Sequence, residues 1–510
     1  VTFLVARGAH AASPAQERTI AVADLRDRIE AAWAGKMIGV AIGFPTEFKF
    51  RGELVPEDKF PQWKPAMLRD GLKQDDLYIQ MTLAEALNEK GLDASTDDYG
   101  AKFRDSKYGL WHAHLAARRL MNRNISAKDA GSPVHNPHFN DISFQIDADF
   151  IGLMSPGMPN SAVEIARRAG VVIGWGQGIP AGGFMSGMYA ASYFETDLRA
   201  VVEAGLKSIP SDCDYAQVIR DVLAMHAEDA SDWQKTWRRI NEKWDRDDVC
   251  PYGALMPLNI DARINGAYVA IGLLYGNGDF EKTIEIATRC GQDSDCNPST
   301  AAGILGAMHG MKLIPATYLE ELPAIRDEKF VYTQTSFNSI VENTLNRAIE
   351  LAKRNGGRVE DEVLHIPVQS PKPIEMPTFD VGVPYERIVC TDSRWNWKGN
   401  WRDEVSVKSG PEKLAVEKGA EASIDFEGTG AIIVGPLLSD GGVAEVYIDG
   451  KLDRAVDVYS DEKLRKASDS VYHNFYLEPG KHTLRLVVRG EPYGASKGTD
   501  IRIMALTVLK

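Results

Sequence analysis

The spacing of apolar residues changes once along this chain, near residue 356, and no other feature constrains the fold as strongly. Before that point apolar residues recur every three or four positions, as in RIEAAWAGKMIGVAIG and LYIQMTLAEALNEKG, which predicts helices. After it, segments such as VAEVYIDG and HTLRLVVRG alternate apolar and polar residues, which predicts strands. The intervening VQSPKPIEMPTFDVGVP is rich in proline and typical of a linker. We therefore predict a multidomain chain: an all-α domain over residues 21–360, a Pro-rich linker over 361–384 and an all-β sandwich over 385–510.

The composition argues against several classes of partner. The chain has 510 residues, of which 44% are hydrophobic and 25% charged, as is ordinary for a globular protein. A net charge of −14 argues against nucleic acid or an anionic membrane as the main partner. No later stretch approaches the ~18 uninterrupted apolar residues of a membrane helix, so we predict no membrane span. The five cysteines are odd in number and form no CxxC, which excludes a disulfide framework and a zinc ribbon but is compatible with one or two bridges.

The first residues, VTFLVARGAHAASPAQER, have some features of an export signal. A short apolar run from Val1 to Ala6 precedes Ala9-His10-Ala11, which has the A-x-A shape of a signal-peptidase site. We predict that residues 1–20 are a truncated signal peptide and tail, cleaved after Ala11, and that the protein is secreted or periplasmic. A disordered tail is the alternative.

Two groups of carboxylates stand at the starts of predicted helices. Asp75 and Asp76 precede LYIQMTLAEALNEKG, and Asp293 and Asp295 precede PSTAAGILGA. Each group alone is explained by helix capping, because the helix dipole favours negative charge at that end. Brought together, four carboxylates would repel one another and raise one another's pKa values. A pair of hard cations relieves this repulsion, so we predict two divalent cations here, because Mg²⁺, Mn²⁺ and Ca²⁺ all prefer oxygen ligands.

Three motifs resemble those of the ADP-ribosylglycohydrolase family, over roughly residues 25–350. GKMIGVAIGFPTEF resembles the family's Gly-Asp-x-x-Gly-x-x-x-Glu segment, Gln74-Asp75-Asp76 its Thr-Asp-Asp, and Asp293-Ser294-Asp295-Cys296 its Asp-x-Asp-Thr. The resemblance implies an all-α fold with two Mg²⁺ at the mouth of a cleft. It places Glu47 on the family's functional Glu and makes the Gln74 amide oxygen a further metal ligand.

The chain departs from the family pattern at three positions. Val40 stands where the family has Asp, and Gln74 and Cys296 stand where it has Thr. These departures resemble a divergent bacterial branch of the family that often carries a C-terminal β-domain. They leave open whether both metal sites are filled and whether ADP-ribose is the substrate.

The β-domain resembles the galactose-binding-like jelly-roll modules of secreted glycosidases. The pieces that carry this resemblance are ASIDFEGTGAIIVGP, GGVAEVYIDGK and LEPGKHTLRLVVRGE. Asp449-Gly450 is typical of a type I′ hairpin turn. Because Trp395, Trp397 and Trp401 lie near the linker, we predict that they pack at the junction with the helical domain.

Further polar residues complete the predicted site. Asp149 heads an apolar run and is awkward to bury, so we predict that it is catalytic together with Glu47. For His135 and His138, the alternative is a structural role. Trp175 lies beside the Gly-rich GWGQGIPAGGF, and its alternative role is tight helix packing. The candidate substrate-binding residues are His135, His138, Asp147, Trp175 and Asn297.

Two functions from different classes follow. The first is a metal-dependent hydrolase of an N- or O-glycosidic bond, acting on a small glycoside, an ADP-ribosylated molecule or a glycan. The second is a non-catalytic relative that binds carbohydrate or another ligand, or is structural. The departures at Val40 and Cys296 favour the second, and the four aspartates with Glu47 favour the first.

Overall fold

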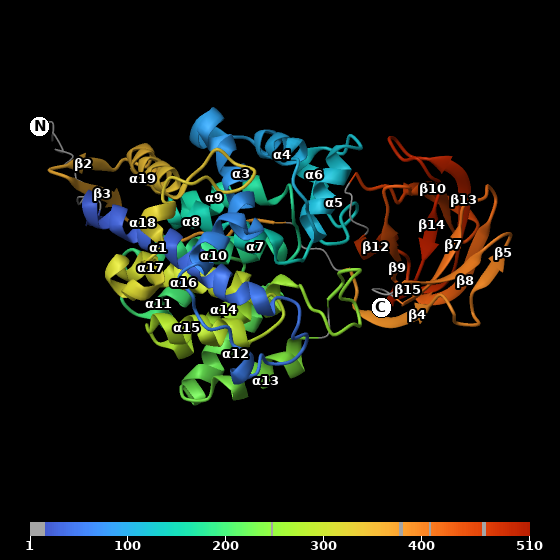
Figure 1. Cartoon of the computed structure of the whole chain (residues 1–510), viewed down its shortest axis with the longest axis horizontal. Helices are drawn as coiled ribbons and strands as arrows, with labels where there is room; N and C mark the ends of the chain where they lie inside the picture. The colour runs from blue at the N-terminus through green and yellow to red at the C-terminus, as the bar shows by residue number, and fades with distance from the viewer. Residues whose placement is uncertain (1–15, 246–247, 377–380, 407–409, 462–465) are drawn as a thin grey trace, which may run out of the picture.

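The computed structural model describes residues 16–245, 248–376, 381–406, 410–461 and 466–510. A helical body and a smaller β-domain lie side by side along the long axis of the molecule (Figure 1). This division into a helical part and a part made of antiparallel sheets confirms the predicted fold class. Within the described ranges, every helix is too short or too polar to cross a bilayer.

Four helices form the interior of the helical body. α10 (Gly178–Ser192), α14 (Ala262–Gly276) and α16 (Cys296–His309) are buried along nearly their whole length, and α1 (Val22–Gly43) is buried from Ala31 onward. This burial explains why their apolar residues surround the helix instead of forming one stripe. Other helices pack around them: α2 (Met67–Asp70), α3 (Asp75–Lys90), α4 (Thr96–Asp105), α5 (His112–Met121), α6 (Ala127–Ala130), α7 (Ser143–Asp147), α8 (Asp149–Leu153), α9 (Pro159–Gly170), α11 (Leu198–Leu206), α12 (Asp214–Glu228), α13 (Trp233–Trp244), α15 (Phe280–Arg289), α17 (Ala316–Leu319), α18 (Leu322–Ile325) and α19 (Phe337–Arg354).

A row of glycines brings α1 against α16. Gly35, Gly39 and Gly43 are four residues apart and share one face of α1. A Cβ atom on them would lie 2.6, 2.4 and 2.0 Å, respectively, from backbone oxygens of α16 or of the turn before it. The two backbones can therefore touch only because these side chains are absent. Since Glu47 follows α1 and the second aspartate pair precedes α16, this contact brings the two parts of the predicted site together.

A small sheet at the far end of the helical body corrects two predicted boundaries. β1 (Glu17–Ala21) pairs antiparallel with β3 (Val363–Pro367), which also pairs with β2 (Arg358–Glu360). Residues 17–20 thus belong to the fold, although the sequence predicted a tail, and the predicted linker begins with a strand. Most of the predicted signal peptide, with its cleavage site after Ala11, lies outside the described residues.

The β-domain consists of antiparallel sheets. The larger has the strand order β11-β10-β13-β8-β5, the second β12-β9-β15-β4, and a third has three strands in the order β14-β7-β6. Alternate residues of β13, Leu484, Leu486 and Val488, are buried on one face together with Ile433 of the second sheet. The strands are β4 (Pro384–Val389), β5 (Asn396–Lys398), β6 (Arg402–Ser406), β7 (Gly410–Ala415), β8 (Glu421–Gly428), β9 (Gly430–Leu437), β10 (Gly442–Ile448), β11 (Lys451–Asp457), β12 (Lys466–Asn474), β13 (Gly480–Pro492), β14 (Ile501–Ile503) and β15 (Ala505–Leu509).

The predicted hairpin turn is confirmed, and the predicted position of the tryptophans is wrong. Asp449 and Gly450 join β10 to β11 with φ values of 51° and 78°, as a type I′ turn requires. Trp395 stacks on Trp397 of β5, and Trp401 donates from its ring nitrogen to the Glu421 backbone oxygen at 2.9 Å. β5 lies at the end of the β-domain far from the helical body (Figure 1), so these rings pack within the β-domain.

Polar and apolar contacts join the two parts. The Arg123 guanidinium donates to the Asp457 carboxylate, at 2.6 Å from Nε, and the Phe139 ring lies 5.9 Å from that of Phe475. Trp175 packs against this same apolar cluster at the junction.

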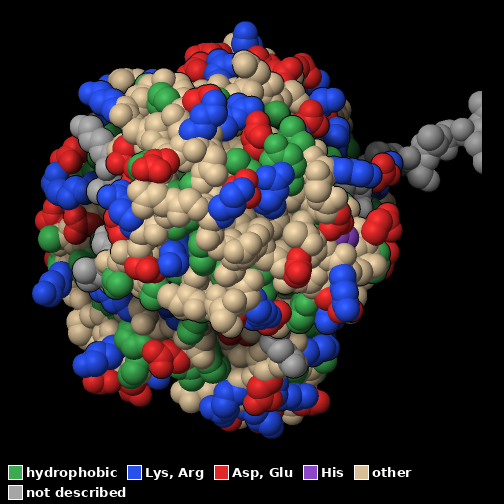
Figure 2. Space-filling view, turned by 90° about the vertical axis from the view of Figure 1, so that its right-hand side faces the viewer, with side chains coloured by type: hydrophobic (Ala, Val, Ile, Leu, Met, Phe, Trp, Pro, Cys, Tyr) green, Lys and Arg blue, Asp and Glu red, His purple; other side chains and the backbone are tan. Residues whose placement is uncertain are grey.

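At the opposite end of the β-domain, acidic and basic side chains are interspersed (Figure 2). The five cysteines form no disulfide, so neither of the bridges compatible with the sequence is present.

Candidate active site

A cavity of about 500 Å³ lies where the helical body meets the β-domain. Its walls come from the exit of α1, the first turn of α3, α5, α7, the start of α16 and strand β12. Its polar lining consists of Glu47, Asp75, Asp76, His112, His114, His138, Ser143, Asp147, Asp293, Cys296, Ser468 and Asp469. Both predicted carboxylate groups therefore face one space, although more than 200 residues separate them in the sequence.

The carboxylates form two groups that share one residue. Ligand atoms of Glu47, Asp293 and Asp295 lie within 4.8 Å of one another, and so do those of Asp76, Asp295 and Cys296. The Cys296 thiol donates to Asp76 at 2.8 Å, and Asp295 caps α16 by accepting the Cys296 backbone N–H. Glu47, Asp76, Asp293 and Asp295 thus converge as predicted, and helix capping accompanies this arrangement. Asp75 lines the same cavity but belongs to neither group, so its role as a metal ligand stays a prediction.

Bound positive charge would stabilise the ionised form of these buried carboxylates. Burial, reinforced by neighbouring carboxylates, raises the pKa of Asp76 and of Asp295. Burial and then Asp293 raise the pKa of Glu47 to about 9. Asp76 Oδ2 and Asp293 Oδ1 are buried and accept no hydrogen bond from the described residues. Unpartnered carboxylate oxygens in such a cluster fit hard divalent cations, which Asp76, Asp293 and Asp295 would hold.

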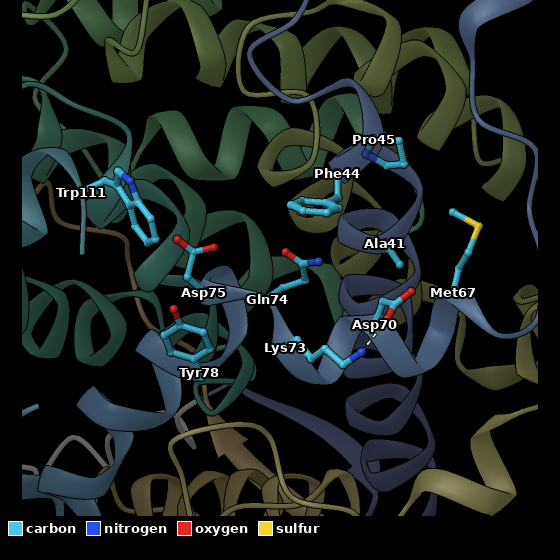
Figure 3. A pocket seen from close by; sticks show the side chains of 10 residues that line it. All are labelled: Ala41, Phe44, Pro45, Met67, Asp70, Lys73, Gln74, Asp75, Tyr78 and Trp111. Atoms are coloured by element: carbon cyan, nitrogen blue, oxygen red, sulfur yellow. Dashed lines mark hydrogen bonds and ion pairs between the residues drawn. The ribbon is translucent and has the colours of Figure 1, made fainter. Parts of the chain in front are cut away.

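Gln74 lies beside this cavity in an adjoining groove. The groove has a volume of about 460 Å³ and shares Phe44, Asp75 and Trp111 with the larger cavity. In Figure 3 the Gln74 amide and the Asp75 carboxylate point to the same side, Gln74 toward the Phe44 ring and Asp75 into the space between Phe44 and Trp111. Phe44 and Trp111 are 51% and 46% exposed. The role of Gln74 as a metal ligand stays a prediction.

Asp149 lines neither cavity, and the structure does not support its predicted catalytic role. Its side chain is wholly buried and forms an ion pair with Lys36 of α1. It also accepts hydrogen bonds from Thr300 of α16 at 2.8 Å and from Tyr189 of α10 at 3.3 Å. An unpaired carboxylate would be costly to bury at this position, as the sequence indicated, and the ion pair with Lys36 offsets that cost.

Three predicted substrate-binding residues also lie elsewhere. Trp175 packs at the junction between the domains, and half-buried His135 lines neither cavity described above. Asn297 is buried within α16, where its amide donates to Asn265 Oδ1 at 3.0 Å. These positions do not support contact with a substrate.

His138 and Asp147 do line the cavity, each with a partner that the sequence did not reveal. Asp147 Oδ2 lies 2.6 Å from His114 Nε2. His138 lies between Asp141 and Asp469, and Asp469 comes from the β-domain. The His-Ala-His sequence at the start of α5 was the one signal in the sequence that could have indicated His114 as a site residue. Asp141 and Asp469 carry no such signal, because they are scattered along the chain.

Comparison with known proteins identifies the helical body. Residues 21–354 match the family model for ADP-ribosylglycohydrolase, so the chain belongs to the ADP-ribosylglycohydrolase family. A solved structure described as an ADP-ribosylglycohydrolase-related protein complex is similar at 15% identity, covering 64% of this chain and 98% of that one, with a TM-score of 0.41.

Two further similarities are short or distant. An A type blood alpha-D-galactosamine galactosaminidase from Flavonifractor plautii is 30% identical over 105 residues, which are 20% of this chain and 10% of that protein. The CBM36-1 domain of a multidomain xylanase from the Trinervitermes trinervoides hindgut metagenome is 14% identical, covers 24% of this chain and 94% of that one, and gives a TM-score of 0.17.

Proposed function

We propose that this protein is a metal-dependent hydrolase that cleaves an N- or O-glycosidic bond at the carboxylate cavity. The observation that carries the proposal is the set of buried carboxylates with unpartnered oxygens, converging from the starts of α3 and α16. Membership of the ADP-ribosylglycohydrolase family supports a glycohydrolase activity. Asp75, Asp76, Asp293 and Asp295 would hold two divalent cations, with Mg²⁺ first.

The cations would supply Lewis-acid polarisation and a lowered pKa for bound water. Glu47 is the carboxyl placed to exchange a proton with the reacting atoms, because it is half-buried while Asp76, Asp293 and Asp295 are buried. Without a cation, burial and Asp293 raise the pKa of Glu47 to about 9. Cations bound by the neighbouring aspartates would lower this pKa, so Glu47 would be ionised and could take a proton from the attacking water. Once protonated, this carboxyl can donate to the departing oxygen or nitrogen.

The walls of the site suit a ring-shaped substrate. The partly exposed aromatic residues Phe44 and Trp111 lie on either side of Asp75, which suits a sugar or base ring held beside the carboxylates (Figure 3). Asp469 and Ser468 of the β-domain close the cavity on another side. We propose a small glycoside, an ADP-ribosylated molecule or the end of a glycan as substrate.

The proposal is tested by a product screen on ADP-ribosylated protein, furanosides and glycans with Mg²⁺ or Mn²⁺ present. Glu47→Gln should lower kcat by about 10²–10⁴-fold, the usual contribution of general acid–base catalysis, and retain metal. Asp293→Asn should lose both metal and activity. Glu85→Gln is the matched control, because Glu85 is also half-buried but lies on α3 outside the cavity. An unchanged kcat in Glu47→Gln would remove Glu47 from the mechanism.

One observation favours a non-catalytic ligand-binding protein instead. Cys296 stands where the family motif has Thr, and its thiol donates a hydrogen bond to Asp76 Oδ1. A thiol is a poor ligand for Mg²⁺. A chain that binds nucleotide sugars in calorimetry, yet turns over no substrate with either cation, would establish this alternative.

A further inference from the structure

We propose a second metal site, distinct from the carboxylate groups, in which His112, His138, Asp141 and Cys250 bind one Zn²⁺ ion. Each residue offers one atom to a common centre, and these four atoms lie within 4.8 Å of one another. The atoms are Nδ1 of both histidines, Oδ2 of Asp141 and Sγ of Cys250. This proposal does not depend on the hydrolase activity.

The distances between these atoms fit the edges of a zinc tetrahedron. Asp141 Oδ2 lies 3.4 Å from the His112 nitrogen and 2.9 Å from the His138 nitrogen. Cys250 Sγ lies 3.8 and 3.3 Å from the same two nitrogens. Zinc bonds of ~2.3 Å to sulfur and ~2.0–2.1 Å to nitrogen or oxygen give edges of about 3.6 Å for S···N and about 3.3 Å for N···O. The observed values lie on both sides of these edges.

The ligand types select the metal. Imidazole nitrogen and thiolate sulfur favour Zn²⁺, whereas Mg²⁺ and Ca²⁺ prefer oxygen alone. Three of the four side chains are buried and His112 is nearly so. A closed set of four protein ligands is typical of a structural zinc site.

An independent feature is the carboxylate on the outer side of His138. Its Nε2 lies 3.1 Å from Asp469 Oδ1 of β12. Metal-binding histidines commonly donate their other N–H to such a carboxylate, which fixes the ring and leaves the facing nitrogen free to bind metal. With Nε2 donating, the lone pair of Nδ1 would face the Asp141 carboxylate at 2.9 Å, a repulsive contact unless a proton or a cation lies between them.

The backbone around Cys250 also fixes its position. Asp248 accepts the Cys250 backbone N–H at 2.8 Å, and Asp141 and Asp261 form a β-bridge. Cys250 does not line the cavity, so the His138–Cys250 pair has no substrate within reach and is poorly placed as a nucleophile. A metal ion here would instead join three chain segments and, through Asp469, the β-domain.

The test is metal binding by the full chain. After removal of bound metal and titration with Zn²⁺, about one zinc per chain should resist dialysis. Replacement by Co²⁺ should give a sulfur-to-cobalt charge-transfer band, since a thiolate ligand is present. Cys250→Ser should abolish that band, while Cys290→Ser, which removes another buried thiol, should retain it. Asp293→Asn should also retain it, which separates this site from the carboxylate cavity.

The partner of His138 gives a second measurement. Asp469→Asn should lower the zinc affinity about 10–100-fold, measured by competition with a chelator. Should Cys250→Ser not fold, X-ray absorption of the zinc-loaded wild-type chain decides, with one sulfur expected at ~2.3 Å. A wild-type chain that takes up no zinc and shows no thiolate–cobalt band would overturn the proposal and leave a purely hydrogen-bonded cluster.

Discussion

At the scale of single residues, the buried Lys36–Asp149 pair shows that a carboxylate outside the cavity can look like a catalytic group in the sequence. Both side chains are inaccessible to solvent. The pair joins α1 to α8, and Thr300 extends its hydrogen bonds to α16. Removing one member of such a pair leaves an uncompensated charge in the interior.

Lys36→Met should therefore lower the free energy of unfolding by about 3–5 kcal/mol, measured by denaturant titration. The double variant Lys36→Met/Asp149→Leu should recover most of this loss, because no charge is then left unpaired. In Asp149→Asn, any loss of activity should follow the loss of folded protein. A stable Asp149→Asn protein with a large fall in kcat would restore the catalytic role.

At the scale of helices and strands, the close contact of α1 with α16 sets the distance between the two carboxylate groups. Gly39→Ala places a methyl group only 2.4 Å from Pro298 O and 2.6 Å from the next two backbone atoms. Backbone on both sides must then move apart, which typically costs about 1–3 kcal/mol. We expect lower stability and weaker binding of Mn²⁺ by the carboxylates, measured by thermal unfolding and calorimetry.

Gly183→Ala on α10 is the matched control for this helix contact. Its new Cβ would lie 3.2 and 3.3 Å from side-chain methyl groups of Ile209 and Ile374, and the nearest backbone atom, Ser208 O, is at an ordinary contact distance of 3.5 Å. Alanine also favours the helix over glycine by about 0.5–1 kcal/mol. The control should thus keep wild-type metal affinity, and an equal loss in both variants would contradict the role of the α1–α16 contact.

These elements also show what the sequence could and could not predict. Local patterns were sufficient for the helices, for the Asp449-Gly450 turn and for the aspartates at the starts of α3 and α16. Pairing across the chain left no such signal: β1 pairs with β3 more than 340 residues away, and Lys36 neutralises Asp149 from 113 residues away. His112 and Cys250 were missed for the same reason, because they meet only after folding.

At the scale of the whole molecule, strand β12 links the β-domain to the cavity and carries a buried histidine beside the junction. Asp469 of this strand lines the cavity, and His473, on the same strand, is buried. Burial, with added repulsion from Arg454, lowers the pKa of His473 to about 3. His473 Nδ1 lies 3.3 Å from the Ser470 hydroxyl oxygen. The His473 ring packs on Phe475, which contacts Phe139 of the helical body.

The depressed pKa of His473 fixes the sign of a pH effect on stability. In the unfolded chain this ring takes up a proton as the pH falls below its ordinary pKa of 6.5, whereas the folded chain resists until about 3. Its contribution to stability is therefore complete above pH 6.5 and is lost as the pH falls through that window. One proton of difference corresponds to a slope of about 1.4 kcal/mol per pH unit.

We expect His473→Gln to remove up to this slope from the unfolding free energy, measured by denaturant titration at a series of pH values. Other titrating groups are common to both proteins, so the difference between wild type and variant isolates His473. His226→Gln, a half-buried histidine on α12, is the control and should change the slope far less. Parallel pH profiles for wild type and His473→Gln would mean that the ring already carries a proton, or meets water, in the docked state. The contacts of Asp457 with Arg123, of Asp469 with His138 and of the apolar cluster would then hold the β-domain without any contribution from the charge state of His473.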